Sequence, residues 1–513
     1  MEGTHKKNLL VFVAEGMPAD TIAACGNPRV KTPNLDRLAV QSTVFHNAYC
    51  TQPLCTPGRA SIFTGRYPHE TCPDNEHNLS PETPCFPELA VFSDYRTAMI
   101  GKWDLGDEVF GQHGFETWRS IDESRNAHYS PGRDRSQETS YALFLREHGY
   151  EPDMPPGRRG NDPRGWFSKP VNILESISPD AYAAQEAKTF IRESCDQPFM
   201  LWMPFLRCKP GAFDEEDEIY DPNEMVLPEN FEHDMENDPR RHPKYRLMAL
   251  GIRKRRNRTP DDWKREIASY LAKVTLIDCY VGEVMDELER QGMMDDTVVV
   301  FTSDHGCMLG EHRMLGKEAM PEKSIKVPMM IRIPGMAENG GVVEAPFSHI
   351  DLVPTLLEAM GREVPDTLPG KSWFPFLSGI EPEEPQRDVM VEWNGPSGKS
   401  AFWKLWQTIT EDIGPYWNGP NLVEIAQIWT DPVRTIITPD GWKYTHSTLG
   451  YHELSNLRKD PGELENLAGE SAYDDVIADL QAKIEKWQEH TNDRCISESR
   501  WCQRDGFVKK TLF

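Results

Sequence analysis

Short, uninterrupted apolar runs recur through the first 300 residues of the chain. They cover residues 8–14, 97–100, 199–203 and 297–301. Runs of this length without alternation are typical of strands buried on both faces of a parallel sheet. Each run stops where a polar motif begins, and ligands of open α/β sheets gather at the carboxyl ends of strands. The pattern predicts an α/β fold with its site at those strand ends.

A helical period and then an antiparallel pattern mark the rest of the chain. Apolar side chains recur at helical spacing from Ile267 to Leu288, which predicts a strong helix, and Asp278 on that helix is expected to be structural. Residues 433–444, with a Pro-Asp-Gly turn, predict an antiparallel hairpin. Residues 474–490 predict a terminal helix.

Length and composition bound the architecture and the partners. At 513 residues the chain exceeds the usual single-domain size, so we expect a catalytic domain over 1–385 and a smaller α+β domain over 386–513. The net charge of −26 argues against nucleic acid or an anionic membrane as partner. The eleven scattered cysteines show no CxxC spacing, so they indicate neither a disulfide framework nor a structural zinc site. The apolar run at 9–14 is too short for a signal segment or a membrane span, which makes the cytoplasm the expected location. A homo-oligomer is compatible with this composition.

The richest motif is Cys55-Thr56-Pro57-Gly58-Arg59, followed by Ala60-Ser61-Ile62-Phe63-Thr64-Gly65-Arg66. A Cys-x-Pro-x-Arg pentapeptide in this context is typical of a cysteine that is converted to formylglycine. The hydrated aldehyde carries two hydroxyls, so one attacks an ester and the other expels the product. A helix starting at this point would turn its N-terminal N–H groups and Arg59 toward an anion. The alternative is a buried structural cysteine beside a turn proline.

Three further motifs follow predicted strands. Asp304 and His305 stand directly after the run at 297–301, where a carboxylate and an imidazole both suit a divalent cation. Lys102 follows the run at 97–100 and is placed to neutralise a transferred anion. Glu15 ends the first run and offers one more carboxylate. Taken singly, each is also explained by an ordinary solvated turn.

Together these motifs resemble the sulfatase family of the alkaline phosphatase superfamily, including its formylglycine-bearing phosphonate monoester hydrolase branch. The resemblance runs along nearly the whole chain. It includes residues 30–38, the Cys55 motif, Gly101-Lys102-Trp103, residues 302–306, 348–355 and 459–467. It implies a large mixed sheet flanked by helices, followed by a small antiparallel sheet with a helix.

The resemblance also implies the roles of the site residues. Cys55 becomes the nucleophile after conversion by a formylglycine-generating maturase. Arg59, Lys102 and Lys317 hold the oxyanion, and His312 is a further substrate-binding candidate. The expected metal ligands are Glu15, Asp304, His305 and converted Cys55. Oxygen-rich ligands make Ca²⁺ the first choice for the one divalent ion, with Mg²⁺ or Mn²⁺ as alternatives.

The chain departs from the family pattern at three points. Glu15 and Gly16 stand where sulfatases usually carry two aspartates, which leaves one carboxylate for the metal. Asp104 replaces the histidine thought to release sulfate, and an aspartate can also act as a base. Lys209, or Cys208 if the register slips by one, replaces the histidine that protonates the leaving group.

These departures leave three readings of the function. We favour hydrolysis of small sulfate monoesters with a rearranged acid and base set. The second reading is hydrolysis of phosphonate monoesters or phosphodiesters, which the single N-terminal carboxylate favours. The third is a pseudoenzyme that keeps the fold without turnover. Retention of Cys55, Pro57, Arg59, Lys102 and Lys317 argues against the third reading.

Overall fold

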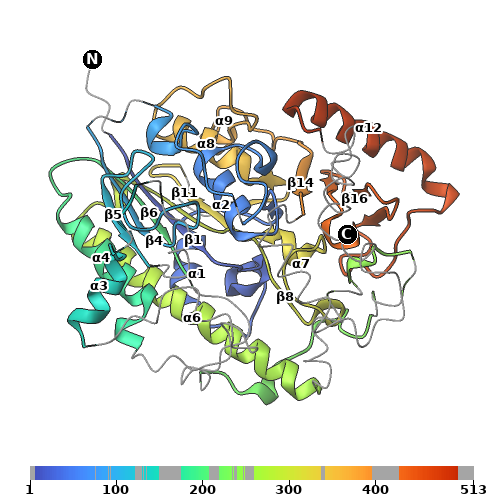
Figure 1. Cartoon of the computed structure of the whole chain (residues 1–513), viewed down its shortest axis with the longest axis horizontal. Coiled ribbons are helices and arrows are strands. Elements are labelled where there is room, and N and C mark those ends of the chain that lie inside the picture. Colours follow the sequence, from blue (N-terminus) through green and yellow to red (C-terminus); the bar gives the residue numbers. More distant parts are fainter. Residues whose placement is uncertain are drawn as a thin grey trace.

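The computed structural model describes residues 6–494 except 76, 91, 93, 122–129, 131, 135, 150–174, 207–218, 234, 236–237, 239, 246–247, 249–258, 337–340 and 396–426. A mixed eight-stranded sheet forms its centre, in the order β12-β2-β11-β7-β1-β6-β4-β5 (Figure 1). Its strands are β1 (Asn8–Ala14), β2 (Thr43–Phe45), β4 (Arg96–Gly101), β5 (Thr117–Ser120), β6 (Phe199–Pro204), β7 (Thr297–Ser303), β11 (Met329–Arg332) and β12 (Gly341–Val343). The strands from β7 to β5 run parallel, whereas β11 is antiparallel to both of its neighbours. The α/β fold and the four strands predicted from apolar runs are confirmed.

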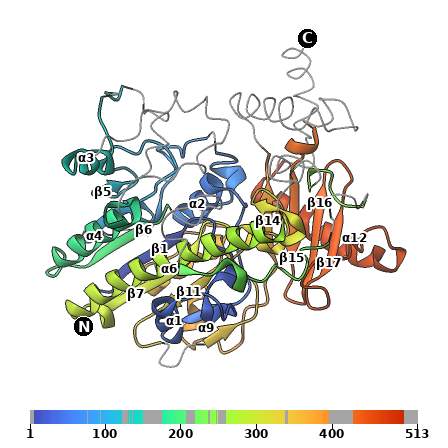
Figure 2. The same cartoon turned by 90° about the horizontal axis from the view of Figure 1, so that it is seen from below.

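Helices cover both faces of this sheet, which is why its central strands are apolar throughout. On β1, Leu10 and Phe12 pack into one core cluster, while Leu9 and Val11 pack into another on the opposite face. The first cluster includes side chains of α1 (Pro33–Val40), α3 (Ser140–Glu147), α4 (Pro179–Arg192) and α6 (Pro260–Arg290). The second includes buried side chains of α2 (Cys55–Thr64) and α8 (Leu352–Ala359), with α9 (Phe374–Leu377) packed against it. Figure 1 shows α2, α8 and α9 on the opposite side of the sheet from α6, and Figure 2 shows α6 crossing in front of the sheet.

Helix α6 is the long helix predicted from the period between Ile267 and Leu288. Thr259 and Asp262 form a capping box at its start, with Pro260 in its first turn. Asp278 accepts hydrogen bonds from the backbone N–H of Leu35, at 2.7 Å, and of Asn34. Its carboxylate therefore ties α6 to the start of α1, which confirms the structural role expected for it.

A four-stranded antiparallel sheet and helix α12 (Asp474–Thr491) lie at one end of the molecule (Figure 2). Its strands are β14 (Val389–Trp393), β15 (Val433–Ile437), β16 (Trp442–Ser447) and β17 (Glu453–Asn456). The predicted hairpin is β15–β16, and Gly441 in its turn has φ +91°, a left-handed conformation that glycine adopts without strain. The N–H of Glu392 on β14 donates to the carbonyl of Thr51 at 2.8 Å, so this sheet contacts the segment that precedes Cys55. The domain boundary at residue 385 stays a prediction.

The smaller elements complete the described chain. They are β3 (Ala48–Tyr49), β10 (Lys326–Val327) and β13 (Phe347–Ser348) in one sheet, β8 (Met308–Leu309) and β9 (Leu315–Gly316) in another, and helix α7 (Glu322–Ile325). Within the described ranges, no helix combines the length and the apolar character needed to cross a membrane.

The segments that follow four strands meet at one edge of the large sheet. Glu15 follows β1, Lys102 follows β4, Phe205 follows β6, and Asp304 follows β7. Ala14 pairs with Ser303 in the β1–β7 register, so the residues after them are neighbours. The parallel strands therefore bring side chains nearly 300 residues apart in the sequence to one place, as their apolar runs predicted.

Candidate active site

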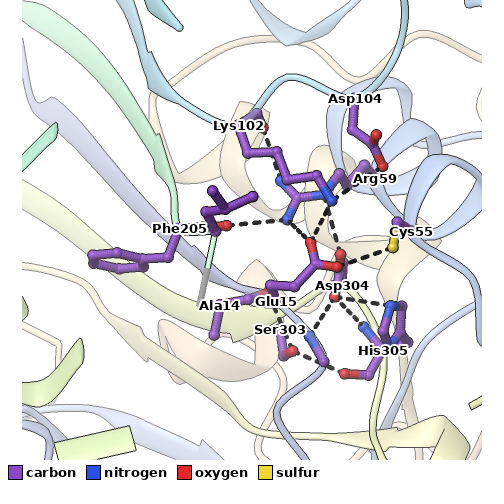
Figure 3. A network of polar contacts seen from close by, with 12 residues as sticks. Ala14, Glu15, Cys55, Arg59, Lys102, Asp104, Phe205, Ser303, Asp304 and His305 are labelled. Atoms are coloured by element: carbon purple, nitrogen blue, oxygen red, sulfur yellow. Dashed lines mark hydrogen bonds and ion pairs between the residues drawn. The ribbon is translucent and has the colours of Figure 1, made fainter. Parts of the chain in front are cut away.

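The site lies where helix α2 begins against the carboxyl ends of β1, β4 and β7 (Figure 3). Cys55 is the first residue of α2 and is only 6% exposed. All ten residues of α2 are buried. The structure brings most of the predicted site residues together in this place: Glu15, Cys55, Arg59, Lys102, Asp104, Asp304, His305 and Lys317.

Gly58 allows α2 to approach the loop after β7 closely. A Cβ atom at Gly58 would lie 2.5 Å from the carbonyl oxygen of Asp304. The first N–H groups of the helix are used within the protein: Thr56 N–H donates to Asn75 Oδ1 at 3.1 Å, and that of Gly58 donates to the carbonyl of Leu54 at 2.9 Å. The start of α2 thus fixes Cys55 rigidly against Asp304.

Arg59 holds the two carboxylates of the site in place. Its Nε donates to Asp304 Oδ2 at 3.1 Å, and one Nη donates to Glu15 Oε2 at 2.9 Å. The guanidinium also donates to the carbonyls of Lys102 and Phe205, so all of its nitrogens have partners in the fold. Burial opposes the charge, but Asp304 and Glu15 outweigh it and raise the pKa of Arg59. The sequence-based assignment of Arg59 to the oxyanion stays a prediction, and the contacts give this residue a positioning role.

Lys102 and Asp104 bring opposite charges to the same side of Cys55. Lys102 Nζ donates to Glu15 Oε2 at 2.7 Å and lies 3.4 Å from Asp104 Oδ2. Thr56 Oγ1 donates to the same Asp104 oxygen at 3.4 Å. Asp104 has φ +63°, which non-glycine residues rarely adopt, and its N–H donates to Glu108 Oε1 at 2.8 Å. Burial opposes the charge of Lys102, but Asp104 and Glu15 raise its pKa well above the usual range.

Among the described residues, Lys317 is the cation in contact with the nucleophile. Its Nζ lies 2.6 Å from Cys55 Sγ and 2.7 Å from His305 Nε2, and the Cys55 thiol donates to Glu15 Oε1 at 3.0 Å. Burial opposes its charge, but Cys55, Glu15 and Asp304 raise the pKa of Lys317. Burial and the Glu15 carboxylate raise the pKa of the Cys55 thiol.

Glu15, Cys55, Asp304 and His305 form a buried group of potential metal ligands. One ligand atom from each lies within 4.8 Å of the others. His305 Nδ1 hydrogen-bonds the carbonyl of Gly306 at 2.8 Å, which fixes the tautomer with the lone pair on Nε2. Burial and Lys317 lower the pKa of His305, whereas burial and Glu15 raise that of Asp304. Two carboxylates, a correctly oriented imidazole and the side chain of Cys55 fit a divalent cation.

Two predicted residues lie outside this group. His312 contacts Asn230 and His233, with 2.9 Å between the two Nδ1 atoms, and none of its hydrogen bonds reaches the site. Burial lowers the pKa of His312 to about 3, so it is neutral. Lys209 falls outside the residues that the structure describes. The roles of both stay predictions.

Sequence reasoning missed two contributors to the geometry. Thr56 provides the hydroxyl beside Asp104, and its place next to Cys55 in the motif was a signal for it. The carbonyl of Phe205 accepts from Arg59, and a backbone acceptor carries no sequence signal.

The comparisons with known proteins agree with the fold. The family model described as Sulfatase matches residues 7–362. The multifunctional alkaline phosphatase superfamily protein PehA of Trinickia caryophylli is 27% identical over 96% of this chain and 98% of its own length. The choline-sulfatase of Rhizobium meliloti is 27% identical over 97% and 91% of the two chains. The fold is similar to that of the phosphonate monoester hydrolase of Agrobacterium radiobacter, with TM-score 0.73, 23% identity and coverage of 95% and 96%. Because the family model spans well over half of the residues, this chain belongs to the sulfatase family of the alkaline phosphatase superfamily and is a hydrolase of that family.

Proposed function

We propose that this enzyme hydrolyses small sulfate monoesters, with Cys55 converted to formylglycine and one divalent ion bound beside it. The observation that carries the proposal is the surroundings of Cys55. Its Sγ contacts both the ammonium of Lys317, at 2.6 Å, and the carboxylate of Glu15, at 3.0 Å. A nucleophile between a cation and a metal-ligating carboxylate suits an anionic ester. Relatives such as the choline-sulfatase and an N-acetylglucosamine-6-O-sulfatase support the sulfate ester class.

The metal would be held by Glu15, Asp304, His305 and the converted side chain of Cys55. The Sγ atom stands where an oxygen of the hydrated aldehyde would lie. When bound, the ion would polarise the ester oxygen and lower the pKa of the attacking hydroxyl. The mainly oxygen donor set favours Ca²⁺, with Mg²⁺ or Mn²⁺ as alternatives.

The remaining charged residues have separate roles in binding the anion and in transferring protons. Lys102 and Lys317 neutralise the transferred anion, because the ammonium of Lys317 contacts Cys55 and that of Lys102 contacts Glu15 beside it. Asp104 takes the proton of the second hydroxyl. Lys102 Nζ lies 3.4 Å from Asp104 Oδ2 and offsets the repulsion between the Asp104 carboxylate and the anion. Lys209 is the proposed acid for the leaving group, with His312 as a further substrate contact. Arg59 keeps the metal-ligating carboxylates aligned.

A mass measurement across Cys55 tests the central step. Protein produced together with a formylglycine-generating maturase should carry the aldehyde and should hydrolyse an aryl sulfate. Cys55→Ala should abolish turnover with the fold intact, whereas the exposed Cys195→Ala should behave as wild type. Unmodified thiol and no turnover on any sulfate or phosphonate ester would instead favour the pseudoenzyme.

One observation favours hydrolysis of phosphonate monoesters or phosphodiesters as a second candidate. After β1 the chain supplies only the Glu15 carboxylate, and Gly16 contributes a backbone N–H to Asp304 Oδ1 at 2.8 Å. The likeness to two phosphonate monoester hydrolase structures concerns the fold alone. Competition between a sulfate ester and a phosphonate monoester with the same leaving group separates the candidates. We expect the higher kcat/KM for the sulfate, and the reverse ranking would replace the first proposal by the second.

A further inference from the structure

A second cluster of metal-ligating side chains lies behind the turn that carries Lys102. Cys85, Glu88 and His113 each place one ligand atom within 4.8 Å of the others. Cys85 is fully buried and caps a short 3₁₀ helix, Phe86–Glu88, whose Glu88 carboxylate accepts from the Cys85 N–H at 3.0 Å. The ring of His113 packs on Trp103 with 5.6 Å between their centroids.

His113 points an unsatisfied nitrogen into this cluster. Its side chain is only 3% exposed, and Nδ1 makes no hydrogen bond with any described residue. Nδ1 lies 3.4 Å from Glu88 Oε2, outside good hydrogen-bond geometry. The His113 ring also forms a hydrogen bond with the backbone of Thr83. A buried nitrogen without a well-formed hydrogen bond is unfavourable, and a cation between Nδ1, the carboxylate and the thiol would satisfy it.

The local backbone holds these groups close together. His113 has φ +53° and Gly114 has φ +78°, so the turn is fixed in a left-handed conformation. A Cβ atom at Gly114 would lie 3.0 Å from both Glu88 Cγ and Pro87 Cβ. Glycine therefore lets the His113 turn sit directly on the helix that ends in Glu88. The side chain of Glu88 is 35% exposed, which gives a cation a path from solvent.

A thiol, an imidazole and a carboxylate make up a donor set that zinc prefers over oxygen-seeking ions. The active-site group, with two carboxylates and one imidazole, has the opposite preference.

We propose that Cys85, Glu88 and His113 bind a zinc ion, with water in the fourth position. Binding releases the proton of the Cys85 thiol to solvent, and the sulfur ligates as a thiolate. The ion joins the helix Phe86–Glu88 to the turn at 113, beside Trp103. The lack of CxxC spacing had argued against structural zinc. The ligands are 3 and 25 residues apart, so only the fold brings them together.

Cobalt substitution tests the site without relying on enzyme activity. The experiment uses full-length, metal-depleted Cys55→Ala protein under reducing conditions, so that the active-site thiol contributes nothing. Added Co²⁺ should produce a thiolate-to-cobalt charge-transfer band at one equivalent, and Zn²⁺ should displace it. Cys85→Ser in the same background should abolish the band, and the exposed Cys195→Ser should leave it unchanged.

Glu88→Gln provides a variant that is expected to fold, because Glu88 is partly exposed. It should weaken cobalt binding by at least about tenfold. Three results would overturn the proposal: no thiolate band in the Cys55→Ala protein, a band that persists in the Cys85→Ser variant, or a disulfide that includes Cys85 in freshly isolated protein. None of these outcomes depends on the metal or the modification proposed for the active site.

Discussion

Gly58 lies where helix α2 passes closest to the loop after β7, and Gly58→Ala tests whether that contact sets the geometry of the site. The added Cβ would lie 2.5 Å from the Asp304 carbonyl oxygen and 3.5 Å from that of Gln52, whereas real Cβ contacts essentially never fall below 3.0 Å. The helix and the Asp304 loop must then separate by about 0.5 Å or more. Both neighbours are backbone atoms, so no side-chain rotation relieves the contact.

The expected change in the free energy of unfolding of Gly58→Ala follows from two opposing effects. Overpacking costs about 1–3 kcal/mol, while alanine in place of glycine within a helix returns about 1 kcal/mol. We expect the free energy of unfolding to fall by up to about 2 kcal/mol. Because the shift separates Cys55 from Asp304, and a 1 Å misplacement can cost about a hundredfold in rate, kcat/KM should fall on the order of tenfold.

Urea denaturation and hydrolysis of an aryl sulfate measure the two effects. Gly341→Ala is the matched control, because a Cβ there meets open space and its φ is ordinary, and we expect both quantities to stay at the wild-type level. Conversion of Cys55 should be unchanged in Gly58→Ala, which the peptide mass across Cys55 checks. A Gly58→Ala protein that is as stable and as active as wild type would refute the argument.

Three further predictions concern charge. Asp104→Asn should lower turnover by a factor of about 10²–10⁴. It should slow sulfate release more than leaving-group release, which is measured by following both products. An unchanged rate would show that Asp104 has no role in the mechanism. Chelation should abolish turnover and Ca²⁺ should restore it, whereas full activity in protein shown by elemental analysis to be metal-free would contradict the metal assignment. Burial opposes the charge of His69, but Glu392 at 3.0 Å outweighs it and raises the pKa of His69 to about 9. Protonated His69 therefore stabilises the folded state fully below about pH 6.5. This contribution to the free energy of unfolding, on the order of 3 kcal/mol at most, is lost as pH rises through about 9. His69→Gln should flatten the decline of the unfolding free energy over that range, and a parallel decline would disprove the linkage.

The fold and the centre of the site were predictable because their signals are local. Unbroken apolar runs identified four central strands, and the residues directly after three of them, Glu15, Lys102 and Asp304, meet in the site. Parallel strands share one carboxyl edge, so order along the chain was enough to predict this meeting. A helix near Cys55 was expected from the Cys55-Thr56-Pro57-Gly58-Arg59 motif, and α2 begins at Cys55.

The remaining features depend on contacts between distant segments. The motif predicts Arg59 near an anion, yet only the fold reveals that its guanidinium is used by Asp304, Glu15 and two carbonyls. Likewise, His312 stands close to Lys317 in sequence, but a left-handed backbone with φ +51° turns it toward Asn230 and His233. The Cys85 and His113 pairing had no spacing signal at all.

The complete burial of helix α2 also has a consequence for timing during synthesis. The proposed conversion of Cys55 would need an extended chain, whereas in the fold α2 is buried and β14 hydrogen-bonds Thr51, four residues before Cys55. β14 ends at Trp393, so ribosomes adding about 5–20 residues per second complete it roughly 20–70 seconds after Cys55. The proposed conversion would therefore have to precede folding of this region, and a maturase slower than translation would leave a fraction of molecules as the thiol.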